Sequence, residues 1–94
     1  MVFNFPATKF VRLNSIPEQA FHVLSEAKEI NDSLTGSDIK HTAREALDCI
    51  HSCETLLRKI QIKHPNINLQ ELRRDVERGN FERQYYELEI PPNH

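Results

Sequence analysis

Apolar side chains recur at alternating intervals of four and three residues through the middle of the chain. The positions are Ile39, Ala43, Ala46, Ile50, Cys53, Leu57 and Ile60. This is the heptad spacing of a helix that packs lengthwise against a partner. We therefore expect a long helix over residues 38–62, and we expect its fold to depend on a neighbouring helix.

The preceding segment can supply that neighbour. It carries its own apolar positions at intervals of three and four, which are Ala20, Val23, Leu24, Ala27, Ile30 and Leu34. Ser15 offers an N-cap oxygen and Pro17 suits a first helical turn, so the pattern predicts a helix over residues 16–34. A break of only a few residues around Gly36 makes the two helices antiparallel neighbours, and Ser37 or Asp38 can cap the second of them.

Three further segments complete the predicted organisation. Residues 1–15 are expected to form an extended arm that packs its phenylalanines onto the helices, with a short strand in the arm as the alternative. Asn68 can cap a third helix beginning near Leu69, and Gly79 is expected to interrupt or end it. The helical domain is then residues 16–86, followed by a mobile tail over residues 87–94.

Composition supports an all-α fold that associates with itself. The chain has 94 residues, only two glycines and 38% hydrophobic residues. A core of this size buries a modest fraction of the chain's surface, so further burial through self-association is expected. We predict a helical hairpin plus a third helix, associating into a multi-helix bundle as a homodimer or homotetramer.

Charge and hydropathy exclude two classes of partner. The net charge is −2 and no basic stripe dominates, which disfavours nucleic-acid binding. No signal peptide and no apolar run of membrane-spanning length is present, so we expect a cytoplasmic protein without a membrane partner. Cys49 and Cys53 are too few for a disulfide framework, and we interpret them as half-buried thiols. A zinc site that adds His51 is the alternative, but helical phase turns His51 away from both sulfurs.

Two carboxylate pairs share the same i,i+3 spacing, Glu26 with Glu29 and Glu45 with Asp48. This spacing places both members of a pair on one face of a helix. Two antiparallel helices would bring the four acids together, and hard cations such as Mg²⁺ bind oxygen ligands of this kind. The simpler interpretation is a solvated acidic face that pairs with Lys28, Lys40 and Arg44. His22 and His41 each lie one turn before an acid and are expected to pair with Glu26 and Glu45.

These motifs resemble those of a known family. S-E-A-K-E over residues 25–29, then 15 residues, then E-A-L-D over residues 45–48 is similar to the E-E-x-x-E and E-x-x-D signature of the MazG-like all-α nucleoside triphosphate pyrophosphohydrolases. V-E-R-G-N-F-E-R-Q-Y-Y over residues 76–86 resembles the family ending V-I-E-K-N-x-x-R-G-Y-Y. The resemblance covers about residues 16–86.

The resemblance implies a site and a reaction. Glu26, Glu29, Glu45 and Asp48 match the acids that hold Mg²⁺, with Mn²⁺ as a substitute, against a nucleoside triphosphate. Water attack then releases a nucleoside monophosphate and pyrophosphate. The tail residues Asn80, Arg83 and Tyr86 match positions that lie near the substrate. Packing of the tail aromatics onto a helix or a partner chain is the alternative.

Three positions depart from the family pattern. Ser25 replaces the first Glu of the acidic motif, Gly79 replaces a Lys, and Gln84 replaces a Gly. The first two departures favour a rival hypothesis, in which the chain is a weak or inactive family member, or an unrelated bundle, that binds nucleotides or a protein without turnover. A purely structural coiled-coil adaptor is a third possibility.

Overall fold

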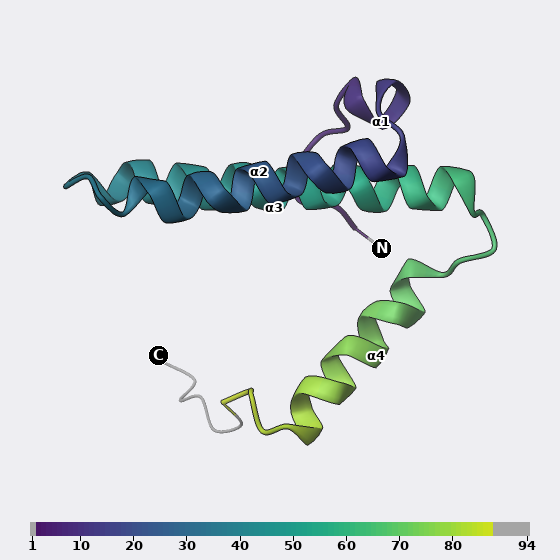
Figure 1. The fold of residues 1–94 in the computed structure, drawn as a ribbon. Coiled ribbons are helices and arrows are strands. Elements are labelled where there is room, and N and C mark those ends of the chain that lie inside the picture. The colour runs from purple at the N-terminus through teal and green to yellow at the C-terminus, as the bar shows by residue number, and fades with distance from the viewer. Residues whose placement is uncertain (1, 88–94) are drawn as a thin grey trace.

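The computed structural model describes residues 2–87 and is built from helices. The elements are α1 (Phe10–Leu13), α2 (Ile16–Ser33), α3 (Ile39–Lys63) and α4 (Leu69–Glu82). Figure 1 shows α2 and α3 lying lengthwise beside each other as an antiparallel hairpin, while α4 points away from its open end. The prediction of an all-α chain with a helical hairpin is confirmed, and the described residues contain no strand.

Local sequence signals explain where the three long helices begin. The Ser15 hydroxyl accepts a hydrogen bond from the Glu18 amide, and the Glu18 carboxylate accepts one from the Ser15 amide, which forms a capping box. Asp38 accepts from the Lys40 amide at the start of α3. Asn68 caps α4 in the same way. All three predicted caps are confirmed.

The interface between α2 and α3 is more polar than the apolar spacing predicted. Gln19 is 1% exposed; its amide donates to the Ser52 carbonyl at 3.1 Å and accepts from Asn14 at 2.8 Å. Nearer the loop, the Ser33 hydroxyl donates to Thr42 at 2.9 Å. Buried polar groups of this kind are stable because each finds a hydrogen-bond partner.

Several positions of the two apolar stripes are consequently exposed. They are Leu24, Leu34, Ile39 and Ile50, with exposed fractions of 64%, 60%, 74% and 46%. The expectation that each stripe faces the other helix is therefore wrong for these residues. Heptad spacing identifies a face that requires a partner, but it does not say whether the partner lies in the same chain.

The N-terminal arm crosses α3 and is hydrogen-bonded to it. The carboxylate of Glu54 accepts from the backbone amides of Asn4 and Phe5 at 3.0 and 2.9 Å. Arg58 donates to the Phe5 carbonyl at 2.7 Å, and the His51 ring stacks on the Phe5 ring at 4.6 Å. The predicted packing of the arm is found for Phe5, but the arm is not extended throughout, since it contains α1.

Helix α4 extends further than its glycine suggested. It continues through Gly79 to Glu82 and ends with the Gln84 amide donating to Phe81 and the Tyr85 amide donating to Asn80. This pair of bonds is a Schellman motif, which requires a left-handed residue at Gln84. Gln84 has φ 61°. A glycine inside a helix weakens it by roughly 1 kcal/mol relative to alanine, which is too little to end it.

Two remaining predictions concern the chain's ends and its hydropathy. Apart from Glu87, the tail predicted over residues 87–94 lies outside the described residues. Among residues 2–87, no helix combines the length and the apolar character that crossing a membrane requires.

A candidate metal centre between the two long helices

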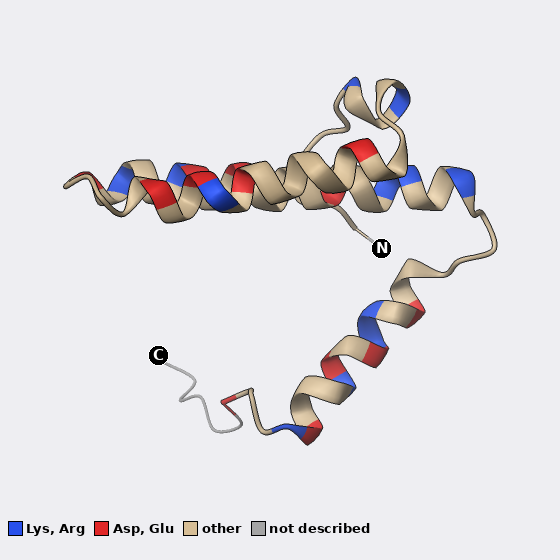
Figure 2. Ribbon diagram, viewed as in Figure 1, with Lys and Arg blue, Asp and Glu red and all other residues tan. Residues whose placement is uncertain are grey.

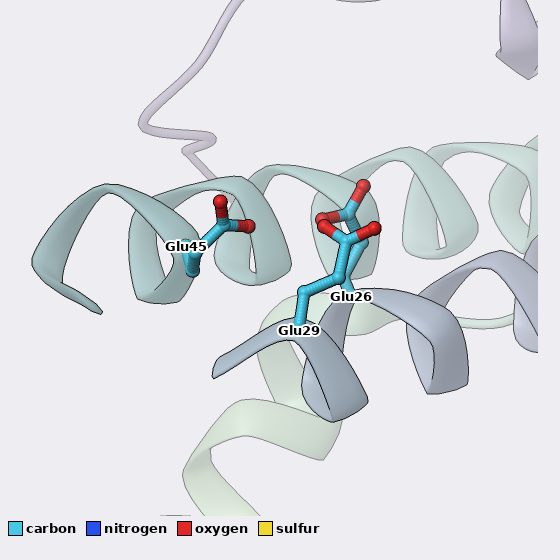
Figure 3. A group of neighbouring side chains, drawn as sticks. All are labelled: Glu26, Glu29 and Glu45. Carbon is cyan, nitrogen blue, oxygen red and sulfur yellow. The ribbon is translucent and has the colours of Figure 1, made fainter. Parts of the chain in front are cut away.

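Three carboxylates from the two long helices meet at one place in the hairpin. Glu26 and Glu29 project from α2 and Glu45 from α3, and one oxygen of each lies within 4.8 Å of the other two (Figure 3). Oxygens that bind one Mg²⁺ at about 2.1 Å lie within roughly 4.2 Å of one another. Adjacent ligands of an octahedral Mg²⁺ lie about 3.0 Å apart, so the three carboxylates would have to close by up to about 2 Å to share one ion.

Two of these carboxylates are largely removed from water. The side chains of Glu26 and Glu45 are 16% and 15% exposed, and the Oε2 atom of each is buried without a hydrogen-bond partner among the described residues. A buried acceptor without a partner is costly, and a charged one more so. The donor set and the two unpaired oxygens fit a bound cation, which would supply the missing partner.

Burial and mutual repulsion act on the proton affinity of the same groups. The pKa of Glu26 is raised, first by desolvation and next by the negative charge of Glu29. The pKa of Glu45 is raised first by desolvation and next by the neighbouring Glu29 carboxylate. Both carboxyl groups therefore hold a proton more tightly than in the unfolded chain, and a divalent cation would displace that proton.

A histidine fixes the second oxygen of each buried acid. His22 Nε2 lies 3.1 Å from Glu26 Oε1, and His41 Nε2 lies 3.5 Å from Glu45 Oε1. The predicted pairing of both histidines is confirmed. In each glutamate, Oε1 is thus the oxygen beside the histidine, and Oε2 is the buried oxygen without a hydrogen-bond partner.

Asp48, the fourth predicted ligand, lies beside this group rather than in it. It lines a cavity of about 140 Å³ together with Glu26, His22 and Ser52. Its negative charge adds a smaller contribution to the raised pKa values of Glu26 and Glu45. Asp48 is thus within electrostatic reach of the centre, and its role as a ligand stays a prediction.

The cysteines do not form a rival centre. Cys49 and Cys53 are free and half-buried, as predicted. His51 is engaged with the arm, since its Nε2 lies 3.1 Å from the Pro6 carbonyl oxygen. Within residues 2–87, the three glutamates are the only group of metal-ligating side chains close enough to share an ion.

The predicted substrate residues form a separate cluster at the end of α4. Asn80 donates to the Tyr86 hydroxyl at 3.4 Å and accepts from Arg83 at 3.3 Å. In Figure 1 this end of α4 lies far from the hairpin. The structure therefore joins the three tail residues to one another but not to the carboxylates of the same chain.

The positions that depart from the family pattern have clear environments. The Ser25 hydroxyl donates to the Phe21 carbonyl at 3.2 Å, so it is turned onto its own helix and away from the carboxylates. A side chain at Gly79 would have open space, with its nearest neighbour an Arg83 nitrogen at 3.9 Å. Gln84 adopts the positive φ that glycine favours, at the position where the family has a glycine.

Sequence reasoning missed the cavity that adjoins the acids. The arm contributes Thr8 to its wall, α1 contributes Phe10 and α3 contributes Thr55. The Thr8 and Thr55 hydroxyls lie 3.3 Å apart across a separation of 47 residues. No local pattern signals such a contact.

Comparisons of the chain with models of known protein families, with curated proteins and with solved structures gave no match in any of the three. The case for a function therefore depends on the geometry of the centre and on the motifs themselves.

Proposed function

We propose that this chain is a Mg²⁺-dependent nucleoside triphosphate pyrophosphohydrolase of the MazG-like type, using Mn²⁺ as a substitute. The observation that carries the proposal is that Glu26 and Glu45, which each have a buried carboxylate oxygen without a hydrogen-bond partner among the described residues, gather with Glu29 between the two long helices. A buried carboxylate oxygen without a partner costs free energy, and a bound cation would offset that cost for both groups.

The carboxylate oxygens favour a particular kind of cation, and that cation favours a phosphate substrate. Carboxylate oxygens suit Mg²⁺ and Mn²⁺, which retain open positions for water and phosphate. A bound divalent cation would offset phosphate charge, orient the triphosphate and increase the acidity of an attacking water. In this proposal Glu26, Glu29 and Glu45 hold the cation and Asp48 adds a fourth carboxylate at the cavity side.

The proposed reaction breaks one phosphoanhydride bond. Water attacks the α-phosphorus, the bond from that phosphorus to the bridging oxygen breaks, and pyrophosphate leaves with the electron pair. A nucleoside monophosphate remains. Ser25 has no carboxylate to take the water's proton, and its hydroxyl is engaged with Phe21, so that proton would pass to the departing pyrophosphate or to solvent. Nucleoside triphosphates, of the ribose or the deoxyribose series, are cytoplasmic metabolites, so the proposal places the protein in the cytoplasm.

We propose further that the working form is a homodimer or homotetramer. Leu24, Leu47 and Ile50 expose apolar area along the hairpin, and only Leu69 is a fully buried apolar residue among those described. The radius of gyration is 16.0 Å, whereas a compact chain of 94 residues has about 12 Å. A second copy would cover the apolar face and form a multi-helix bundle.

The same association accounts for the separated tail. Asn80, Arg83 and Tyr86 lie together on α4, away from the carboxylates of their own chain. In a dimer, α4 of one copy can approach the hairpin of the other. Arg83 would then contact phosphate across the interface.

The second candidate function is nucleotide or protein binding without turnover. The orientation of Ser25 favours it, because nothing in that position replaces the family's carboxylate. A non-hydrolysable triphosphate analogue would then bind tightly with Mg²⁺ present, while the natural triphosphates remain intact.

The deciding experiment is a panel of ribo- and deoxyribonucleoside triphosphates assayed for pyrophosphate release with Mg²⁺ and with Mn²⁺. The proposal expects metal-dependent release from at least one of them. Tight metal-dependent binding without release, together with gain of activity in Ser25→Glu, would support the binding module instead. No nucleotide binding and no release would exclude the hydrolase and the nucleotide-binding module.

A further inference from the structure

A second pocket, opposite in charge to the carboxylate centre, opens at the other end of the hairpin. It has a volume of about 500 Å³ and is formed where α1, the start of α2 and the end of α3 meet. Its lining includes Arg12 from α1, Lys59 and Lys63 from α3, and His64 just after α3. Figure 2 shows basic residues on α1 and at this end of α3, whereas most acidic residues of the hairpin lie, with basic ones among them, in the half nearer its loop.

Lys59 is the unusual member of this group. It is 9% exposed, and within residues 2–87 it has neither a hydrogen bond nor a carboxylate oxygen within 4.0 Å. Its nitrogen is not among the buried, unpartnered polar atoms of the described residues, so its stem is buried while the ammonium group keeps contact with water. The buried stem also holds the ammonium group in one place at the pocket wall, so little side-chain freedom remains to be lost on binding an anion.

One acid offsets the charge of Lys59 only in part: the pKa of Glu18 is lowered mainly by its hydrogen bonds with Ser15 and to a smaller extent by Lys59. Arg12 and Lys63 also have no ion pair in the described part of the chain. Glu18 is the one acid in the pocket lining, and its carboxylate already accepts the Ser15 amide in the capping box. The first turn of α2 adds the partial positive charge of a helix N-terminus. Three permanent cations therefore face a single, engaged carboxylate.

We propose that this pocket binds a phosphate group. A phosphate dianion matches a site with several cations and a helix N-terminus, and the pocket is large enough for more than one phosphate. The site is distinct from the carboxylate centre, because Asp48 and Lys59 are eleven residues apart on α3 and hence about 16 Å along its axis. Its existence does not depend on the proposed hydrolase activity.

The test is a titration of the full-length, metal-free protein with inorganic phosphate and with pyrophosphate, in EDTA and at constant ionic strength, followed by amide NMR shifts. We expect saturable shifts around Ser15–Glu18 and Lys59–His64, and tighter binding of pyrophosphate than of phosphate. Lys59→Gln should weaken both by about tenfold or more. Lys40→Gln, an exposed lysine on the same helix, should change neither. The proposal would be overturned if the amide shifts of the wild type did not saturate, or if Lys59→Gln bound both anions as tightly as the wild type.

A second variant separates binding from folding. Lys59→Met keeps the apolar stem and removes the charge, so its melting temperature should equal or exceed that of the wild type in phosphate-free buffer. Added pyrophosphate should stabilise the wild type and leave Lys59→Met unchanged. A melting temperature several degrees below the wild type in the absence of phosphate would show that Lys59 has a partner within the protein, and the anion site would be rejected.

Discussion

The hairpin and helix α4 are both amphipathic, yet the two regions use their polar side chains in opposite ways. In the hairpin, polar groups such as Gln19 and Ser52 are buried between α2 and α3. In α4, the polar groups pair with each other on the surface, as Arg73 does with Glu77 at 3.1 Å. Surface pairs contribute little to stability, whereas buried unpaired carboxylates require a ligand. The clustered carboxylates therefore lie in the hairpin, and the proposed association would complete α4.

The largest expected effect comes from removing one buried acid of the hairpin. Glu45→Gln keeps the side chain's shape but removes a charge on the proposed cation, which contributes several kcal/mol to the transition state. We expect pyrophosphate release to fall by roughly a hundredfold or more. Asp32→Asn is the control, since Asp32 lies on α2 in an exposed pair with Lys28. Equal loss in both variants would show that the centre has no special role.

The next prediction tests whether a second copy covers the exposed apolar face. Ile50 is 46% exposed in the single chain. Ile50→Glu should therefore fold, but should weaken association by at least about tenfold, because burying a charge at an apolar contact is costly. Light scattering after size exclusion measures the change. Glu77→Gln on α4 is the control that should not alter the mass. A monomeric wild type would remove the basis of the prediction.

A smaller effect concerns stability and pH. The pKa of Glu26 is raised, so the unfolded chain loses this proton at lower pH than the native chain. The stability that this group contributes is complete below about 4.5 and is lost as pH rises through the raised pKa. Glu26→Gln should melt a few degrees above the wild type near pH 7 without metal, and the difference should vanish at low pH.

The same pair of proteins can be measured with metal. Mg²⁺ should raise the melting temperature of the wild type at pH 7 and have less effect on Glu26→Gln. Thermal scans from pH 4 to pH 8, with and without Mg²⁺, provide both readings. A wild-type stability that rises relative to Glu26→Gln as pH increases would contradict the account, since it would require a lowered pKa.

The smallest effect is local to α4. Gln84 has φ 61°, a conformation that costs a residue with a side chain about 1 kcal/mol. Gln84→Gly should stabilise the end of α4 by about that amount, seen as slower hydrogen exchange of the Tyr85 amide, which donates to Asn80. Gln70→Gly, inside α4, should instead destabilise the helix. Faster exchange in Gln84→Gly would contradict the interpretation of this helix end.

The parts of the structure that could be predicted are those encoded locally. Ser15, Asp38 and Asn68 cap the helices that they were expected to cap, because capping depends on residues three or fewer positions away. The spacing of Glu26, Glu29 and Glu45 likewise placed them on coherent faces. Helical phase and a short loop were enough to bring them together.

The remainder depended on contacts between distant residues. The apolar spacing predicted that Leu24 and Ile50 pack between the helices, but both are exposed. Periodicity alone cannot tell a partner helix in the same chain from one in a second copy. The arm's attachment to Glu54 spans about fifty residues and has no local signature. The burial of Lys59 could not be predicted either, since lysine is ordinarily a surface residue.

The most direct test of the central claim is a calorimetric titration of the protein with Mg²⁺ and with Mn²⁺, without nucleotide. The account predicts a saturable site in the wild type and in Asp32→Asn, and its loss in Glu45→Gln. Absence of binding in the wild type, or unchanged binding in Glu45→Gln, would contradict the assignment of a metal centre to the hairpin.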